Sequence, residues 1–162
     1  MGTFSISREN NMKRFLSLLL TIILSLSISA CSGYNGIMRK HLSNKDNYYD
    51  IDAILCSYRE DKDRIYLYVS VNDKTAFDSY EKNSDEIKLE LVGDNCNVIK
   101  EVLANEEIRK GDKITVKCST WIYMDSTFYY IAEIKNKDKT FLSFDYGLKN
   151  IIKYINDNKS LL

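Results

Sequence analysis

The chain has 162 residues, and its 23 lysine and arginine side chains balance its 23 aspartate and glutamate side chains. This length is enough for one ordinary domain with an apolar core of its own. The balance leaves no basic excess to neutralise phosphate groups, so the composition argues against nucleic acid as a partner.

The first thirty residues differ from the rest of the chain. A short basic cluster at residues 12–14 precedes an uncharged apolar run, residues 15–28, and two small residues then stand immediately before Cys31. A basic start, a short apolar run and a small-residue cleavage point indicate a secretory signal. The run is shorter than the roughly 20 apolar residues that a membrane-spanning helix needs. Residues 1–30 are therefore predicted to be a removable signal peptide.

The residues Ile28, Ser29, Ala30 and Cys31 resemble the lipobox of bacterial lipoproteins. The resemblance implies that the sulfur of Cys31 receives a diacylglyceryl group and that the peptide before it is cut away. It also implies a position in the cell envelope, outside the cytoplasm, with a lipid anchor in a membrane, which two acyl chains hold stably. The alternatives are an uncleaved membrane anchor and an ordinary secretory signal.

The exported part begins with a segment that we interpret as a tether. Residues 31–47 are polar, contain two glycines and lack hydrophobic periodicity, which is typical of a flexible connection. Residues 48–158 then form a single domain. The signal peptide carries three basic residues and one acidic residue, so the exported part has a net charge of about −2.

Three segments of the domain alternate apolar and polar residues, as half-buried strands do. They are residues 48–58, 64–71 and 86–92. The positions expected to face the core are Ile51, Ala53, Leu55, Ile65, Leu67, Val69, Val71, Ile87, Leu89 and Leu91. The same alternation places Lys88 and Glu90 on the solvent side.

Helical and strand patterns follow to the end of the chain. Residues 98–104 are predicted to form one or two helical turns, residues 113–124 and 128–135 a long hairpin, and residues 140–144 a last strand. A closing amphipathic helix, capped by Asp145, is predicted from apolar residues at i, i+3, i+4 and i+7. These are Leu148, Ile151, Ile152 and Ile155.

This order of elements predicts a mainly β fold of the α+β class. Three strands, a short internal helix, a long hairpin and a C-terminal helix resemble a small OB-like β-barrel. The resemblance is one of topology, and OB folds have many unrelated functions. A β-sandwich is the alternative.

The sequence offers little catalytic chemistry. The single histidine, His41, lies in the predicted tether, so neither a histidine triad in the domain nor a two-histidine metal site is expected. No cofactor motif is present. Asp50 and Asp52 share a face of the first strand, as i and i+2 must. Their carboxylates leave an envelope hydrolase as the alternative function, although a solvated strand face explains them as well.

The register of the long hairpin can be predicted from its pattern. If residues 125–127 form a three-residue loop, Cys118 opposes Ile134 and Ile122 opposes Tyr130, so one face is apolar throughout and should be the core. A slip by one residue would turn every side chain over.

In that register Trp121, Tyr123 and Tyr129 lie away from the core. Exposed aromatic rings of this kind are a candidate ligand-binding surface. The alternative is that the C-terminal helix covers the rings through Ile151 and Ile155.

Three cysteines remain besides Cys31, namely Cys56, Cys96 and Cys118, so at most one disulfide can form within a monomer. Taken together, the sequence predicts a membrane-anchored lipoprotein that acts as a non-enzymatic binding module without a cofactor or metal. Its expected partners are the membrane, through the lipid, and an envelope protein or a glycan, with nucleic acid excluded.

Overall fold

A computed structural model describes Ser17 and residues 36–75, 77, 84–123, 125–137 and 139–158. Met38–Asn158 forms one compact unit. The predicted signal peptide, apart from Ser17, and Cys31 lie outside the described residues. Within the described part of the chain, no helix combines the length and apolar character needed to cross a bilayer.

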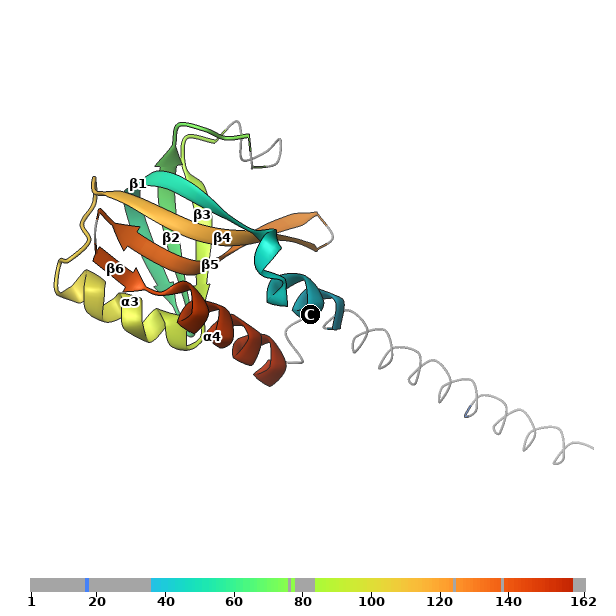
Figure 1. The fold of residues 1–162 in the computed structure, drawn as a ribbon. Coiled ribbons are helices and arrows are strands. Elements are labelled where there is room, and N and C mark those ends of the chain that lie inside the picture. The colour runs from blue at the N-terminus through green and yellow to red at the C-terminus, as the bar shows by residue number, and fades with distance from the viewer. Residues whose placement is uncertain are drawn as a thin grey trace, which may run out of the picture. The chain divides into compact units, whose positions relative to one another are not determined.

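Six strands form a single sheet in the order β3-β2-β1-β4-β5-β6 (Figure 1). They are β1 (Tyr48–Asp61), β2 (Arg64–Val71), β3 (Ile87–Val92), β4 (Lys113–Tyr123), β5 (Ser126–Asn136) and β6 (Lys139–Leu142). Neighbours in this order are antiparallel, and an additional parallel pairing joins β3 to β5 at Glu90 and Tyr130. The predicted mainly β class is confirmed, and one sheet replaces the alternative of two packed sheets.

Helical segments accompany the sheet at residues 36–43, at the short 3-10 helix η1 (Lys45–Asn47), and at α3 (Asp94–Ala104) and α4 (Phe144–Asp157). In Figure 1, α3 and α4 lie next to each other below the strands. The predicted Asp145 cap is wrong, because Ser143 takes the extended N-cap conformation. Asp145 lies in the first turn of α4, where a negative charge still suits the helix dipole.

The main apolar core lies on the inner face of the sheet. The predicted inward positions of β1, β2 and β3 are all buried there, which confirms the alternation. Cys96, Ile99, Val102 and Leu103 of α3 pack against this core. Removing this much apolar surface from water contributes more than any other effect to the stability of a small domain.

A second apolar cluster lies on the opposite face of β5. Successive residues of a strand point to opposite faces, so Ile131 joins the main core whereas Tyr130 and Ala132 join the second cluster. Helix α4 covers them with Leu148 and Ile151, and the predicted apolar stripe of this helix is thereby confirmed.

The helix approaches the strand most closely at Gly147. A Cβ atom built on Gly147 would lie 2.0 Å from the carbonyl oxygen of Ala132. No larger residue fits without moving the helix, although alanine is the better helix former by about 1 kcal/mol. Asn95 of α3 donates a hydrogen bond to the Gly147 carbonyl at 3.0 Å, and Asn150 donates to Asn95 at 2.9 Å. These buried amides fix α3 against α4.

The compact unit starts earlier in the chain than the predicted domain. Residues 38–47 belong to the predicted tether, but Met38 and Leu42 are buried in the second cluster. They are one helical turn apart. Polar residues surround these two apolar positions in the sequence, so no hydrophobic period is visible there. We call residues 38–43 the N-terminal helical segment.

Candidate functional site

The β4–β5 hairpin has a different register from the predicted one. Tyr123 pairs with Ser126 and Trp121 with Phe128, so residues 126 and 127 belong to the strand instead of a loop. A register shift between Lys117 and Cys118 separates this part of the hairpin from its base. A bulge adds a residue to one strand only, and the continuous alternation assumed from the sequence fails at that point.

The three predicted binding residues consequently do not form one surface. Tyr129 is 1% exposed in the main core, with its ring centroid 5.1 Å from that of Phe77. Trp121 is half-buried against the second cluster, to which Ile151 and Ile155 also belong. Tyr123 is half-buried. Tyr129 was wrongly predicted to point away from the core. Trp121 packs against the second cluster, and its ring lies beside that of His41.

The opposite error concerns Ile122, which was predicted to lie in the core but is 64% exposed. His41, predicted to lie in a tether, packs its ring 5.5 Å from the Trp121 ring. The nitrogen Nε2 of His41 donates to the carbonyl of Thr120 at 2.9 Å, and Nδ1 accepts from Asn47 at 3.1 Å. The N-terminal helical segment is therefore held against the end of β4.

A different set of polar and charged residues lies together on the outer face of β1, β2 and β3. We call it the β1–β3 polar face; its members are Arg59, Arg64, Tyr66, Tyr68, Lys88 and Glu90. Their Cα partners across the strands place Arg59 beside Tyr66, Tyr66 beside Glu90, and Tyr68 beside Lys88. The guanidinium of Arg59 lies 4.9 Å, and the ammonium of Lys88 5.4 Å, from the centroid of the Tyr66 ring. A cation placed over the face of an aromatic ring is attracted electrostatically to that ring.

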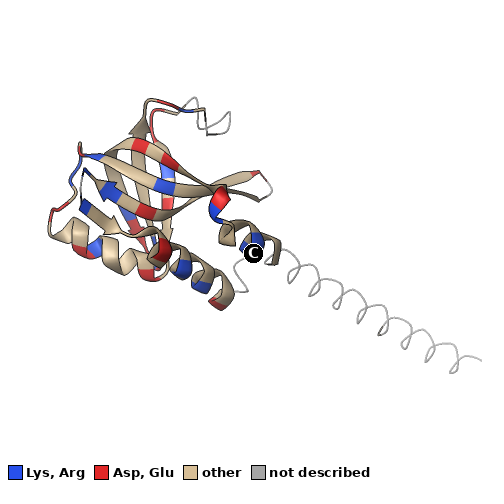
Figure 2. Ribbon diagram, viewed as in Figure 1, with Lys and Arg blue, Asp and Glu red and all other residues tan. Residues whose placement is uncertain are grey.

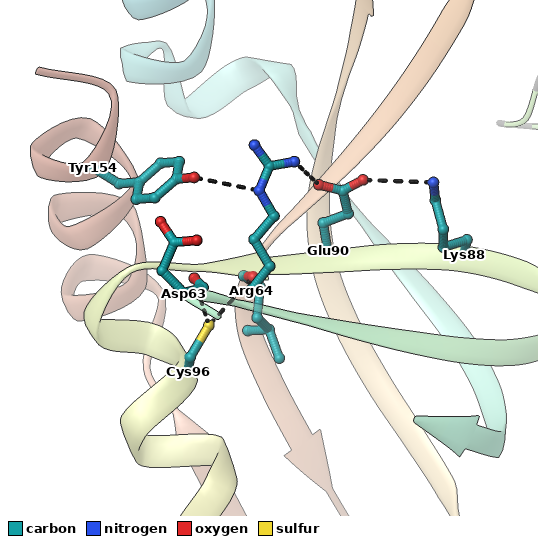
Figure 3. Close-up of polar contacts among 7 residues, drawn as sticks. Asp63, Arg64, Lys88, Glu90, Cys96 and Tyr154 are labelled. Carbon is teal, nitrogen blue, oxygen red and sulfur yellow. Dashed lines mark hydrogen bonds and ion pairs between the residues drawn. The ribbon is translucent and has the colours of Figure 1, made fainter. Parts of the chain in front are cut away.

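Glu90 is the centre of an ion-pair network on this face (Figure 3). Its side chain is only 1% exposed, with Arg64 at 3.5 Å and Lys88 at 3.7 Å on its two oxygens. Arg64 also donates from Nε to the hydroxyl of Tyr154 in α4 at 3.3 Å. The prediction that Glu90 faces solvent is wrong, because the sheet continues from β3 to β5 beside it and α4 closes over that edge.

Burial raises the pKa of the Glu90 carboxyl, although the charges of Arg64 and Lys88 oppose this. Burial alone would lower the pKa of Arg64, but its hydrogen bond to Tyr154 and the charge of Glu90 outweigh that effect and raise it. Arg64 is therefore charged at any physiological pH. The buried Glu90 carboxylate thus lies between two cations, Arg64 and Lys88, at the surface of the sheet.

A hollow of about 340 Å³ lies beyond the far end of the β1–β3 polar face. It is bounded by the cross-strand pair Ile54 and Ser70 and by two lysines, Lys113 and Lys137. Its size falls in the range of small-molecule sites, roughly 300–1,000 Å³. Charged residues of both signs are spread over the strands of the sheet (Figure 2).

The carboxylates considered for hydrolysis have separate partners. Asp50 lies 3.5 Å from the ammonium of Lys117, and Asp52 accepts a hydrogen bond from Thr115 at 2.7 Å. Both are exposed on β1, so their contacts are those of a solvated strand face. Among the described residues, no three His, Cys, Asp or Glu side chains converge as a metal site would require.

The three remaining cysteines are unpaired in the structure. Burial raises the pKa of Cys96 to about 11 and that of Cys118 to about 12. Thiols with such values are not nucleophiles at neutral pH. The Cys96 thiol donates to the carbonyls of Asp63 and Leu91, which indicates a structural role at the start of α3 (Figure 3).

Comparison with known proteins gives a fold-level likeness. No protein family matches this sequence, and no curated protein matches it. Among solved structures, the chain is similar to a chain of a replication protein A heterotrimer bound to single-stranded DNA. The identity is 9%, the TM-score is 0.37, and the likeness covers 69% of this chain and 71% of that one.

This comparison corrects the expected partners. Nucleic acid was excluded, and an envelope protein or a glycan was named in its place; a DNA-bound assembly is now among the similar structures. The exclusion is withdrawn, and so are the two partners named instead. The exclusion of nucleic acid rested on the net charge of the whole chain. Net charge does not describe a local surface, and the β1–β3 polar face carries three cations. At this TM-score the likeness carries no argument for any ligand.

The packing of Trp121 can be tested by truncation. Trp121→Ala should lower the free energy of unfolding by about 2 kcal/mol, because the indole covers part of the second cluster. The matched control is Ile122→Ala, the next residue on the exposed face, which should change it by less than about 0.5 kcal/mol. Urea unfolding followed by circular dichroism measures both. Equal, small effects of the two substitutions would show that Trp121 does not support the fold.

The buried Glu90 carboxyl should give the stability a specific pH dependence. Its pKa is raised in the folded protein, so the associated stabilisation is present below the unfolded pKa of about 4.3 and is lost as the pH rises through the folded pKa. Glu90→Gln does not titrate, so its stability relative to the parent should rise as the pH is increased above about 4.3, the unfolded pKa, towards the raised folded pKa. Urea unfolding across this range measures the difference. If the difference in unfolding free energy between Glu90→Gln and the parent stays constant or decreases as the pH rises, the pKa of Glu90 is not raised in the folded protein.

Proposed function

We propose that this protein is a bacterial lipoprotein of the cell envelope, whose exported domain is a non-enzymatic binding module. The observation that carries the proposal is the sequence of the N-terminus, where an uncharged apolar run ends in small residues directly before Cys31. Attachment of lipid to Cys31 would leave a mature protein without a spanning helix but with a stable anchor.

Because the compact unit begins at Met38, the link between the lipid and the domain is short. Only six residues, 32–37, separate Cys31 from Met38, the first residue of the unit. At about 3.6 Å per extended residue they span no more than roughly 22 Å. An anchored domain would thus be kept close to the membrane surface, much closer than a tether reaching residue 47 would allow.

For the architecture of the domain, we propose an OB-type barrel. The support is the connectivity: β1, β2 and β3 pair in sequence, α3 follows, and the β4–β5 hairpin pairs with β1 on one side and β3 on the other. This strand order and the β3–β5 pairing resemble the order and closure of the five-stranded OB fold, and the resemblance supports the proposal. OB-type domains bind diverse ligands on their strands, so the fold is compatible with a binding role without specifying the ligand.

For the binding surface, we propose the β1–β3 polar face together with the hollow at its far end. Two features support it: the cations are held in place by Glu90 and Tyr66, and the adjacent hollow is lined by Lys113 and Lys137. Lys113 and Lys137 at the hollow, with further cations along the same face of the sheet, favour a small ligand with an anionic group, and Asp52 at the hollow could contact a polar part of that ligand. The separate contacts of Asp50 and Asp52 give the hydrolase alternative no such support.

Lipidation can be tested by metabolic labelling. Cells given labelled fatty acid should label the parent protein, and Cys31→Ser should abolish both the label and the membrane attachment, because the thioether cannot form. Cys56→Ser, which removes a partly exposed thiol in β1, is the matched control and should keep both. An unlabelled parent, or a labelled Cys31→Ser protein, refutes the lipoprotein assignment.

Ligand binding can be tested separately by filling the hollow. The protein is purified from its own membrane in mild detergent, and native mass spectrometry should detect a retained small molecule. Ser70→Trp places an indole at the hollow and should lose this mass, whereas Lys153→Trp on the exposed side of α4, beside Asp94, should keep it. Retention by Ser70→Trp would exclude the hollow, and absence of any added mass in the parent would count against a tightly held ligand.

A further inference from the structure

We propose that the N-terminal helical segment and the tip of β4 form a surface that docks on the anionic headgroups of the membrane holding the anchor. The inference rests on the proposed lipidation of Cys31. It adds an orientation: one end of the domain lies on the bilayer, instead of the domain tumbling freely on its link.

The distribution of charge favours this end of the chain. Residues 32–45 contain three basic residues and no acidic one, whereas residues 46–162 have a net charge of −5. Positive charge is therefore concentrated next to the anchor point, although the exported protein as a whole is acidic. Basic residues beside a membrane anchor are attracted to anionic lipid over about a Debye length.

The structure directs two of these charges outward. Met38 and Leu42 are buried in the second cluster, so the remaining face of the helical segment is turned to solvent. Arg39 and Lys40 are exposed there, and neither forms an ion pair with another described residue. The third cation, Lys45, is paired with Asp145 at 2.8 Å. Arg39 and Lys40 are thus the groups available to headgroups.

An apolar side chain lies at the same end of the domain. His41 of the helical segment contacts Trp121 and bonds to the backbone of Thr120, so the segment and the end of β4 are neighbours. Ile122 is next along β4 and is 64% exposed. Its side chain lies on the strand face opposite to Trp121, but at the same end of the domain as the exposed cations. Exposed aliphatic and basic side chains at one end of a domain are typical of a surface that contacts a membrane interface.

The short link makes even a weak contact effective. Six residues hold the domain within about 22 Å of the lipid, and such tethering gives an effective local concentration in the millimolar range. Two cations and one isoleucine would not bind a membrane from solution, but they are enough to orient a domain that is already attached.

Trp121 is the only tryptophan in the chain and reports on this end of the domain. The full-length lipoprotein is reconstituted in vesicles of phosphatidylcholine and phosphatidylglycerol with brominated acyl chains, which quench a nearby indole. We expect quenching that weakens with salt. Arg39→Glu combined with Lys40→Glu should remove at least about half of it. The matched control reverses two charges at the opposite end of β4, Lys110→Glu with Lys113→Glu, and should quench as the parent does.

The outcomes separate the two proposals. If the protein incorporates labelled fatty acid but Trp121 is unquenched, or is quenched equally in both charge-reversal variants, docking is refuted and the lipoprotein assignment stands. If no fatty acid is incorporated, the anchor is absent, and both the lipoprotein assignment and the docking proposal are refuted. Labelled protein whose quenching depends on Arg39 and Lys40, and not on the control pair, supports docking.

Discussion

The close approach of α4 to β5 is the contact on which both proposed functional surfaces depend. At Gly147 the backbone of the helix lies against the Ala132 carbonyl, with no room for a Cβ atom. This approach places Tyr154 within hydrogen-bonding distance of Arg64 and forms the second cluster, under which Trp121 is half-buried. The polar network around Glu90 and the position of the N-terminal helical segment both follow from it, because each includes residues of α4 or residues packed on it.

Local patterns were sufficient to predict most elements of this fold. The alternation in β1 to β3 and the apolar stripe of α4 reflect which side of each element meets the core, and burial confirms them. Patterns failed where the geometry changes without a change in composition. The bulge adds a residue to β5 and turns the following side chains over, so Tyr129 enters the core; Ile122 keeps the face of Cys118 but is exposed at the tip of the hairpin, beyond the core. Met38 and Leu42 were too few to show a period.

The candidate site could not be predicted in the same way, because its members come from different strands. Arg59, Tyr66 and Lys88 are far apart in the sequence and meet only through the pairing of β1 with β2 and of β2 with β3. Glu90 sits between two leucines in an alternating strand and carries no local signal of burial. Whether a polar strand position is solvated or covered depends on the neighbouring strand and helix, which alternation does not encode.

The proposed docking surface and the proposed binding surface are compatible because β4 separates them. Lys113, at the hollow, begins this strand, and Ile122, at the docking end, lies nine residues further along it. At about 3.3 Å per residue the two are roughly 30 Å apart. A domain lying on the bilayer by its N-terminal helical segment would keep the hollow away from the headgroups and open to the surrounding solvent. In the proposed arrangement the short link would restrict the orientation of the domain, and that orientation would leave the proposed binding surface accessible.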